Sequence, residues 1–177
     1  MSPPAKLYCI DTCSLIERNS RGKYPHEVFP SLWDRIDGLI SSGRLFSSEE
    51  VLSEIKKCTD VADATHQWAI NNSAIFLPID NDVQDECLKI QGDFPQLCDA
   101  NGTKSQGDPW VIATAVKFAY VVVTEERPIL PNLRNTPQDI AKTKAHPTRL
   151  KIPDVCRCIG VDCVNLIGLM RHERWTF

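Results

Sequence analysis

Hydrophobic positions along the chain fall into short unbroken runs separated by longer stretches with helical spacing. The runs at 7–10 (LYCI) and 120–124 (YVVVT) are apolar without alternation, which is typical of strands covered on both faces. Shorter strands are expected at 44–46 and 161–164, and 75–77 is expected to be either a short strand or a packed connection. The pattern therefore predicts several short parallel strands.

Helices are predicted between these runs. Leu32, Ile36 and Leu39 have helical spacing, with Pro30 near the start and Gly43 past the end. A capping box of Ser47 and Glu50 opens the next helix. Further helices are expected at 61–70, 83–94, 108–118, 152–159 and 166–171. Strands that alternate with helices predict a three-layer α/β/α sandwich with a mainly parallel sheet. A length of 177 residues suits a single domain spanning 1–177.

Composition narrows the class of protein. The chain has no apolar run long enough to span a membrane and no basic segment followed by an apolar one at its start. We therefore expect a cytoplasmic protein with no membrane partner. Eight cysteines are many for this length, but Cys156, Cys158 and Cys163 form C-x-C-x4-C, which lacks the usual zinc spacing. Buried free thiols are the favoured interpretation, with structural zinc as the alternative.

Charge is distributed unevenly. The net charge is −3, yet residues 127–151 carry six basic residues and one acid, Asp139. A basic segment beside clustered acids suits a polyanion held over a metal site. The alternative is a solvated charged loop.

Four acids from distant parts of the sequence are predicted to meet. Asp11 and Glu126 each follow a predicted strand, and parallel strands end at the same edge of a sheet, where ligands bind in open α/β folds. Asp108, followed by Pro109, is expected to cap the helix that leads into the second of these strands. Glu54 lies on the flank of its helix's apolar stripe and so points partly inward.

Such a cluster favours a bound cation. Two carboxylates about 4 Å apart repel by roughly 4 kcal/mol at an effective dielectric near 20. Oxygen ligands suit Mg²⁺ or Mn²⁺, and such ions activate water for phosphodiester cleavage. Each acid also has a plainer interpretation, as a turn residue for Asp11, a helix cap for Asp108, a surface side chain for Glu54 and a loop residue for Glu126.

Four segments carry a resemblance to a known family. They are "IDTCSLI" at 10–16, "EEVLSEI" at 49–55, "GDPWVIATA" at 107–115 and "VVVTEE" at 121–126. In this order they resemble the PIN-domain superfamily of metal-dependent ribonucleases, which includes the VapC-type toxins. The tail "IPDVCRCIGVDCVNLIGLMR" is similar to a less-characterised bacterial and archaeal branch of PIN-like proteins. The resemblance covers nearly the whole chain.

The resemblance implies a Mg²⁺- or Mn²⁺-dependent endoribonuclease. It further implies that the protein is the toxin of a toxin–antitoxin pair, with RNA as substrate, an antitoxin protein as partner and a possible homodimer. The catalytic and metal-binding residues it implies are Asp11, Glu54, Asp108 and Glu126. Among the basic residues of 127–151, we expect Arg134, Lys142 and Lys144 to bind that RNA.

Two hydroxyl residues and a second glutamate complete the implied site. The family pattern places a water-orienting hydroxyl on Ser14 and a threonine at a strand end on Thr124. Many family members have an aspartate after this threonine, whereas this chain has two glutamates. Glu126 matches the usual spacing, and Glu125 is the alternative fourth acid.

Three other functions are alternatives to the ribonuclease. The first is a PIN-like module without catalysis that binds RNA or protein. An aspartyl-nucleophile phosphatase needs D-x-D after the first strand, but Cys13 stands where the second aspartate would be. A dinucleotide-binding enzyme is disfavoured because no G-x-G-x-x-G follows the first strand.

Overall fold

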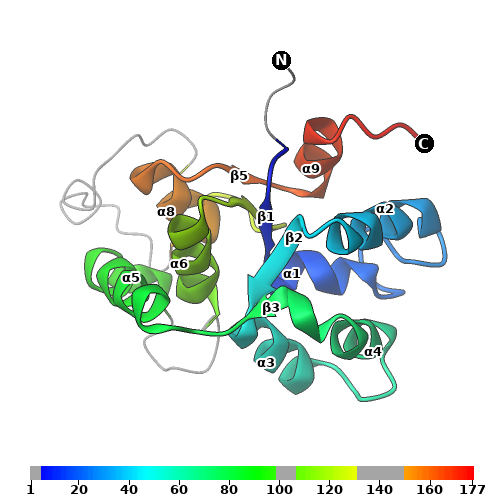
Figure 1. The fold of residues 1–177 in the computed structure, drawn as a ribbon, viewed down its shortest axis with the longest axis horizontal. Coiled ribbons are helices and arrows are strands. Elements are labelled where there is room, and N and C mark those ends of the chain that lie inside the picture. Colours follow the sequence, from blue (N-terminus) through cyan, green and yellow to red (C-terminus); the bar gives the residue numbers. More distant parts are fainter. Residues whose placement is uncertain (1–4, 99–106, 131–149) are drawn as a thin grey trace.

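A five-stranded, all-parallel sheet forms the centre of the protein (Figure 1). The structure is a computed structural model, and it describes residues 5–98, 107–130 and 150–177. The strand order is β3-β2-β1-β4-β5. The strands are β1 (Tyr8–Ile10), β2 (Leu45–Ser48), β3 (Phe76–Leu77), β4 (Val121–Val123) and β5 (Cys163–Val164).

Helices cover both faces of this sheet. In Figure 1, α5, α6 and α8 lie on one side of the strands, and α1, α2, α4 and α9 lie on the other. This arrangement confirms the predicted three-layer α/β/α sandwich. The helices are α1 (Thr12–Leu15), α2 (Pro30–Ser41), α3 (Glu49–Cys58), α4 (Ala64–Asn71), α5 (Asn81–Asp93), α6 (Asp108–Phe118), α8 (Ile152–Ile159) and α9 (Leu166–His172), with short 3₁₀ turns η1 (Ile16–Arg18), η2 (Ser73–Ile75) and η3 (Pro95–Leu97).

The two central strands set the register of the sheet. Every residue of β1 and β4 is buried, as expected for strands with helices on both faces. Ile10 pairs with Val123, so both strands end at the same level. The backbone N–H of Asp11 extends the ladder by donating to the carbonyl oxygen of Val123 (2.9 Å). The residues that follow β1 and β4 are therefore neighbours at the carboxyl edge of the sheet.

Two predicted helix starts are wrong by one residue. Ser48, not Ser47, caps α3, where its hydroxyl accepts from the N–H of Glu50 (3.4 Å). Ser47 belongs to β2 and donates to the carbonyl oxygen of Ile10 (2.6 Å), because its side chain lies on the buried side of the strand. Likewise α6 begins at Asp108 with Gly107 as its N-cap, and no side chain of the described residues caps it. Asp108 is thus free of the capping role that its sequence context suggested.

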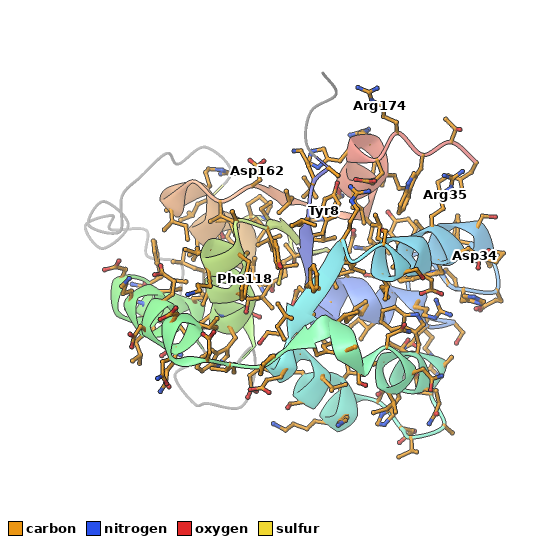
Figure 2. The ribbon with its side chains drawn as sticks, in the orientation of Figure 1. Tyr8, Asp34, Arg35, Phe118, Asp162 and Arg174 are labelled. Atoms are coloured by element: carbon orange, nitrogen blue, oxygen red, sulfur yellow. The ribbon has the colours of Figure 1, made fainter. Side chains whose placement is uncertain are left out.

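At the amino edge of the sheet, two side chains contact Glu173, the residue just after α9. The hydroxyl of Tyr8 donates to Glu173, just after α9 (2.6 Å), and Arg44 forms an ion pair with the same carboxylate (2.6 Å). Figure 2 shows Tyr8 between β1 and α9, and Asp162, which precedes β5, at the same end of the molecule. These contacts anchor the carboxyl end of α9 at the amino edge of the sheet, opposite the acids.

Two further findings concern membranes and thiols. Within the described ranges, no helix is long and apolar enough to cross a bilayer. All eight cysteines are free, and Cys9, Cys87 and Cys156 are buried.

Candidate functional site

Asp11 is buried where β1 turns into α1. Its side chain is 3% exposed and caps α1, with Oδ1 accepting from the N–H of Thr12 (2.7 Å). Its Oδ2 accepts from the Cys13 thiol (2.8 Å) and the Thr124 hydroxyl (3.1 Å). The carboxylate is therefore held in one orientation by donors from both β1 and β4 ends.

Glu54 reaches the same edge from α3. Its Oε2 accepts from the hydroxyl of Thr12 (2.5 Å), and its Oε1 accepts from the backbone N–H of Gly107 (2.9 Å). A Cβ atom on Gly107 would lie 2.8 Å from this carboxylate, so glycine is needed for the close approach. Glu54 thus ties the start of α6 to the residue that follows Asp11.

Asp108 is the first residue of α6 and is 6% exposed. Its Oδ2 is buried and has no hydrogen-bond partner among the residues that the structure describes. Buried carboxylate oxygens are costly to leave unpaired, because they lose water without a replacement donor. This oxygen is the feature of the site that the protein's own groups leave unsatisfied.

The negative charges of Glu54 and Glu126 act on both Asp11 and Asp108. Burial raises the pKa of Asp11 to about 6, with added repulsion from Glu126 and Glu54, against the hydrogen bonds from Cys13 and Thr124. Burial also raises the pKa of Asp108 to about 8, and the charges of Asp11, Glu126 and Glu54 add to this effect. Raised pKa values of this kind occur where buried carboxylates have too few positive partners, and a bound cation would lower them.

Glu125 and Glu126 point in different directions after β4. Glu126 accepts from the N–H of Ile152, at the start of α8 (3.0 Å), and pairs with Lys151. Glu125 accepts from the N–H of Leu166, at the start of α9 (2.9 Å), and pairs with Lys23 (2.8 Å).

Only one of these two glutamates joins the acid cluster. The charge of Glu126 acts on both Asp11 and Asp108, whereas Glu125 is not among the charges that shift them. The charges therefore group Glu126, rather than Glu125, with Asp11 and Asp108, and the role of Glu126 as the fourth acid stays a prediction.

The hydroxyl groups are used differently from the predicted pattern. Thr124 is buried and contacts Asp11, as expected of a residue that orients the site. Ser14 is fully buried, and its hydroxyl donates to the carbonyl oxygen of Val123 (3.3 Å) rather than to a carboxylate. Thr12 and Cys13 make the carboxylate contacts instead, because the first turn of α1 directs them toward the acids.

Four residues of the site were not predicted from the sequence. They are Thr12, Cys13, Gly107 and Lys151. The signals for the first three were their positions next to Asp11 and Asp108 in "DTC" and "GD". Lys151 was counted only as part of the basic segment, 25 residues from its partner Glu126. The predicted RNA-binding residues Arg134, Lys142 and Lys144 lie outside the described residues.

The donor set fits a hard divalent cation. Asp11 and Asp108 offer carboxylate oxygens, which suit Mg²⁺ or Mn²⁺, and the unpaired Oδ2 of Asp108 lacks the positive partner that such an ion provides. Within the described ranges, no three His, Cys, Asp or Glu side chains are already grouped closely enough to hold a metal ion. Glu54 and Glu126 both already accept hydrogen bonds from protein donors.

Fold and site together define a class of protein: a parallel α/β/α sandwich with buried acids at the carboxyl edge of its central strands. The chain belongs to the family described as "Domain of unknown function (DUF4411)", which matches residues 8–177. A comparison with curated proteins found no match.

Proposed function

We propose that this protein is a PIN-like ribonuclease that needs Mg²⁺ or Mn²⁺ and hydrolyses RNA phosphodiester bonds. The observation that carries the proposal is the buried Oδ2 of Asp108, which has no partner within the described ranges and lies near the charge of Asp11, at the edge where parallel α/β sheets bind ligands. A cation there would offset both the missing hydrogen bond and the repulsion between the carboxylates.

The choice of RNA rests on the sequence. The four segments that resemble PIN-domain ribonucleases contain Asp11, Glu54, Asp108 and Glu126, and the charges of Glu54 and Glu126 act on both Asp11 and Asp108, which supports this choice. The basic residues between 127 and 151 suit a polyanionic substrate.

The reaction is hydrolysis of a phosphodiester. The oxygen of a water molecule bonds to phosphorus, the bond from phosphorus to one ester oxygen breaks, the water gives up a proton and the leaving oxygen takes one. Asp11 and Asp108 would hold the cation. When bound, it lowers the pKa of water and stabilises charge on the leaving oxygen.

The protein's own groups keep the acids in place for this chemistry. Thr124 and Cys13 fix the orientation of Asp11 through hydrogen bonds to Oδ2. Thr12 and Gly107 hold Glu54 over the start of α6. Preorganised groups of this kind save the cost of ordering them at the moment of reaction.

A non-catalytic PIN-like module that binds RNA or protein is the second candidate. The observation in its favour is that both oxygens of Glu126 already have protein partners, Lys151 and the N–H of Ile152. In such a module the acids would stabilise helix starts without cleaving a substrate.

A cleavage assay separates the two candidates. Purified protein is incubated with labelled single-stranded RNA in Mn²⁺, in Mg²⁺ and in chelator. We expect cleavage only with metal, and its loss in Asp11→Asn and Asp108→Asn. Glu27→Gln, a change at an exposed acid, serves as the matched control. RNA that binds but stays intact with wild-type protein in both metals would favour the module.

The biological role is proposed on the same resemblance. We propose a cytoplasmic toxin that an antitoxin protein restrains. Induced expression of the wild-type chain in a bacterial host should then arrest growth, and Asp108→Asn should relieve the arrest. Equal growth inhibition by both chains would contradict the toxin role.

A further inference from the structure

We infer that Lys151 acts as the second positive charge of the site: one divalent cation binds at Asp11 and Asp108, and the Lys151 ammonium, held on Glu126, contacts a non-bridging oxygen of the scissile phosphate. This inference rests on the proposed function and names a further residue for it. It assigns Glu126 to the lysine rather than to a second metal ion.

Glu126 is fully engaged by protein donors. Its Oε1 pairs with the Lys151 ammonium, and its Oε2 accepts from the N–H of Ile152 (3.0 Å). The side chains of Lys151 and Glu126 are 26% and 13% exposed, so water competes little for the pair. Partly buried ion pairs are screened less than surface pairs. Each oxygen of this carboxylate therefore already accepts from a protein donor, and a second metal ion would compete with the Lys151 ammonium for it.

The backbone of Lys151 is fixed, unlike that of a typical surface lysine. It is the N-cap residue of α8 and adopts an extended conformation. The buried carboxylate of Asp154 accepts from its N–H (3.1 Å) and also from the N–H groups of Ile129 (3.1 Å) and Leu130 (2.9 Å). Asp154 therefore ties the segment after β4 to the start of α8. The turn before α8 thus positions the Lys151 ammonium next to Glu126.

Lys151 acts on one of the two proposed metal-binding acids, Asp108. Its positive charge opposes the repulsion that Asp11, Glu126 and Glu54 exert on Asp108. Among the described residues, it is the one positively charged side chain that lowers the pKa of Asp108. An ammonium held at this point can neutralise negative charge on the phosphate, as a metal ion would, because lysine binds phosphate as a point charge.

A cavity beside Glu126 carries both acidic and basic side chains in its lining. A cavity of about 410 Å³ is lined by Glu125 and Glu126 and by the basic side chains of Lys23, Arg127 and Arg157. A nucleotide next to the scissile phosphate fits a cavity of this size. Glu126 lines this cavity, so a nucleotide bound there would lie beside the Glu126–Lys151 pair at the end of β4.

The neighbouring Lys23–Glu125 pair provides a matched control. It repeats the same arrangement, with a glutamate that accepts from the first N–H of a helix and pairs with a lysine (2.8 Å). Glu125 does not act on Asp11 or Asp108. Removing the charge of Lys23 therefore reports the effect of losing such a pair outside the acid cluster.

The direct test is the stoichiometry of Mn²⁺ binding, measured by electron paramagnetic resonance of free Mn²⁺ and by calorimetry without RNA. We expect one Mn²⁺ per chain for wild type and for Lys23→Met. We expect two for Lys151→Met, because Glu126 is released to bind metal. Lys151→Gln is measured in parallel, and circular dichroism establishes that each variant is folded. Two Mn²⁺ per wild-type chain, or one in both Lys151 variants, would overturn the inference.

Cleavage kinetics give the second measurement. We expect Lys151→Met to lower kcat at least tenfold with a smaller change in KM for RNA, and Lys151→Arg to recover most of the loss, since arginine keeps the charge. Wild-type kcat in Lys151→Met would overturn the inference, while metal-dependent cleavage lost in Asp108→Asn would leave the proposed function standing. If wild-type protein binds no Mn²⁺ and leaves RNA intact, both fail together.

Discussion

Glu125 and Glu126 are adjacent in the chain, yet they bind the first N–H groups of two different helices. Glu125 accepts from Leu166 in α9 (2.9 Å) and Glu126 from Ile152 in α8 (3.0 Å). Successive side chains of an extended segment point to opposite sides, and the two helices lie on opposite faces of the sheet (Figure 1). One glutamate is thereby directed away from the acids and the other toward them.

This difference predicts unequal effects of two similar substitutions. Glu126→Gln removes a charge that acts on Asp11 and Asp108, so we expect it to lower RNA cleavage tenfold or more, about 1.4 kcal/mol in the barrier. Glu125→Gln removes a pair with the half-exposed Lys23, and we expect less than a twofold change. Single-turnover cleavage rates compare the two. A larger loss at Glu125 would contradict the assignment of Glu126 to the site.

The basic segment offers a prediction about binding rather than chemistry. We expect simultaneous neutralisation of Arg134, Lys142 and Lys144 to weaken RNA binding and to reduce the slope of log K against log salt. Each phosphate contact on a single strand contributes about 0.7 to that slope. Fluorescence anisotropy in chelator, at several salt concentrations, measures it without cleavage. A slope equal to that of wild type would identify the segment as a solvated loop.

Much of the fold was predictable from the sequence because its signals are local. The unbroken run before Thr124 and the apolar run before Asp11 predicted the two central strands, and the last helix was expected at 166–171, close to its observed range Leu166–His172. The helix starts at Ser47 and Asp108 were wrong by one residue. Propensity favours Ser and Asp as caps, but tertiary contacts decided which residue takes that position.

The candidate site was predictable only as a set of acids. Strand order places Asp11 and Glu126 at one edge by topology, so that part followed from parallel pairing. The partners of these acids did not follow. Lys151 reaches Glu126 because Asp154 fixes the turn before α8, and Gly107 faces Glu54 because α3 and the start of α6 approach closely. Such contacts between distant residues have no local sequence signal.

The raised pKa of Asp108 predicts how stability depends on pH without metal. In the folded protein this carboxyl has a pKa of about 8, whereas an unfolded aspartate has one near 3.9. The folded state therefore keeps its proton while the unfolded state loses it, and stability falls as the pH rises through this window. One pKa unit corresponds to about 1.4 kcal/mol. We expect the free energy of unfolding to drop by more than that amount between pH 5 and pH 8.

Urea unfolding in chelator at both pH values measures this drop. Asp108→Asn removes the titrating group, so its stability should vary less with pH and exceed that of wild type at pH 8. Glu27→Gln, at an exposed position, should behave as wild type. Mn²⁺ should raise the stability of wild type at pH 8, because a ligand of the folded state stabilises it by mass action, and should do little for Asp108→Asn. Parallel pH profiles for wild type and Asp108→Asn would show that this carboxyl is not the buried acid described here.

The last prediction concerns two glycines. A Cβ on Gly107 would lie 2.8 Å from the Glu54 carboxylate, whereas a Cβ on Gly92, near the end of α5, has nothing within 4 Å. We expect Gly107→Ala to push Glu54 from its place beside Thr12, lowering Mn²⁺ affinity and RNA cleavage at least tenfold while circular dichroism stays unchanged. Gly92→Ala should leave both intact and stabilise the protein by about 0.5–1 kcal/mol, since alanine favours helix. Calorimetric Mn²⁺ titration and thermal melts of both variants measure these effects. Equal Mn²⁺ affinity in Gly107→Ala and Gly92→Ala would mean that the position of Glu54 does not matter for the metal.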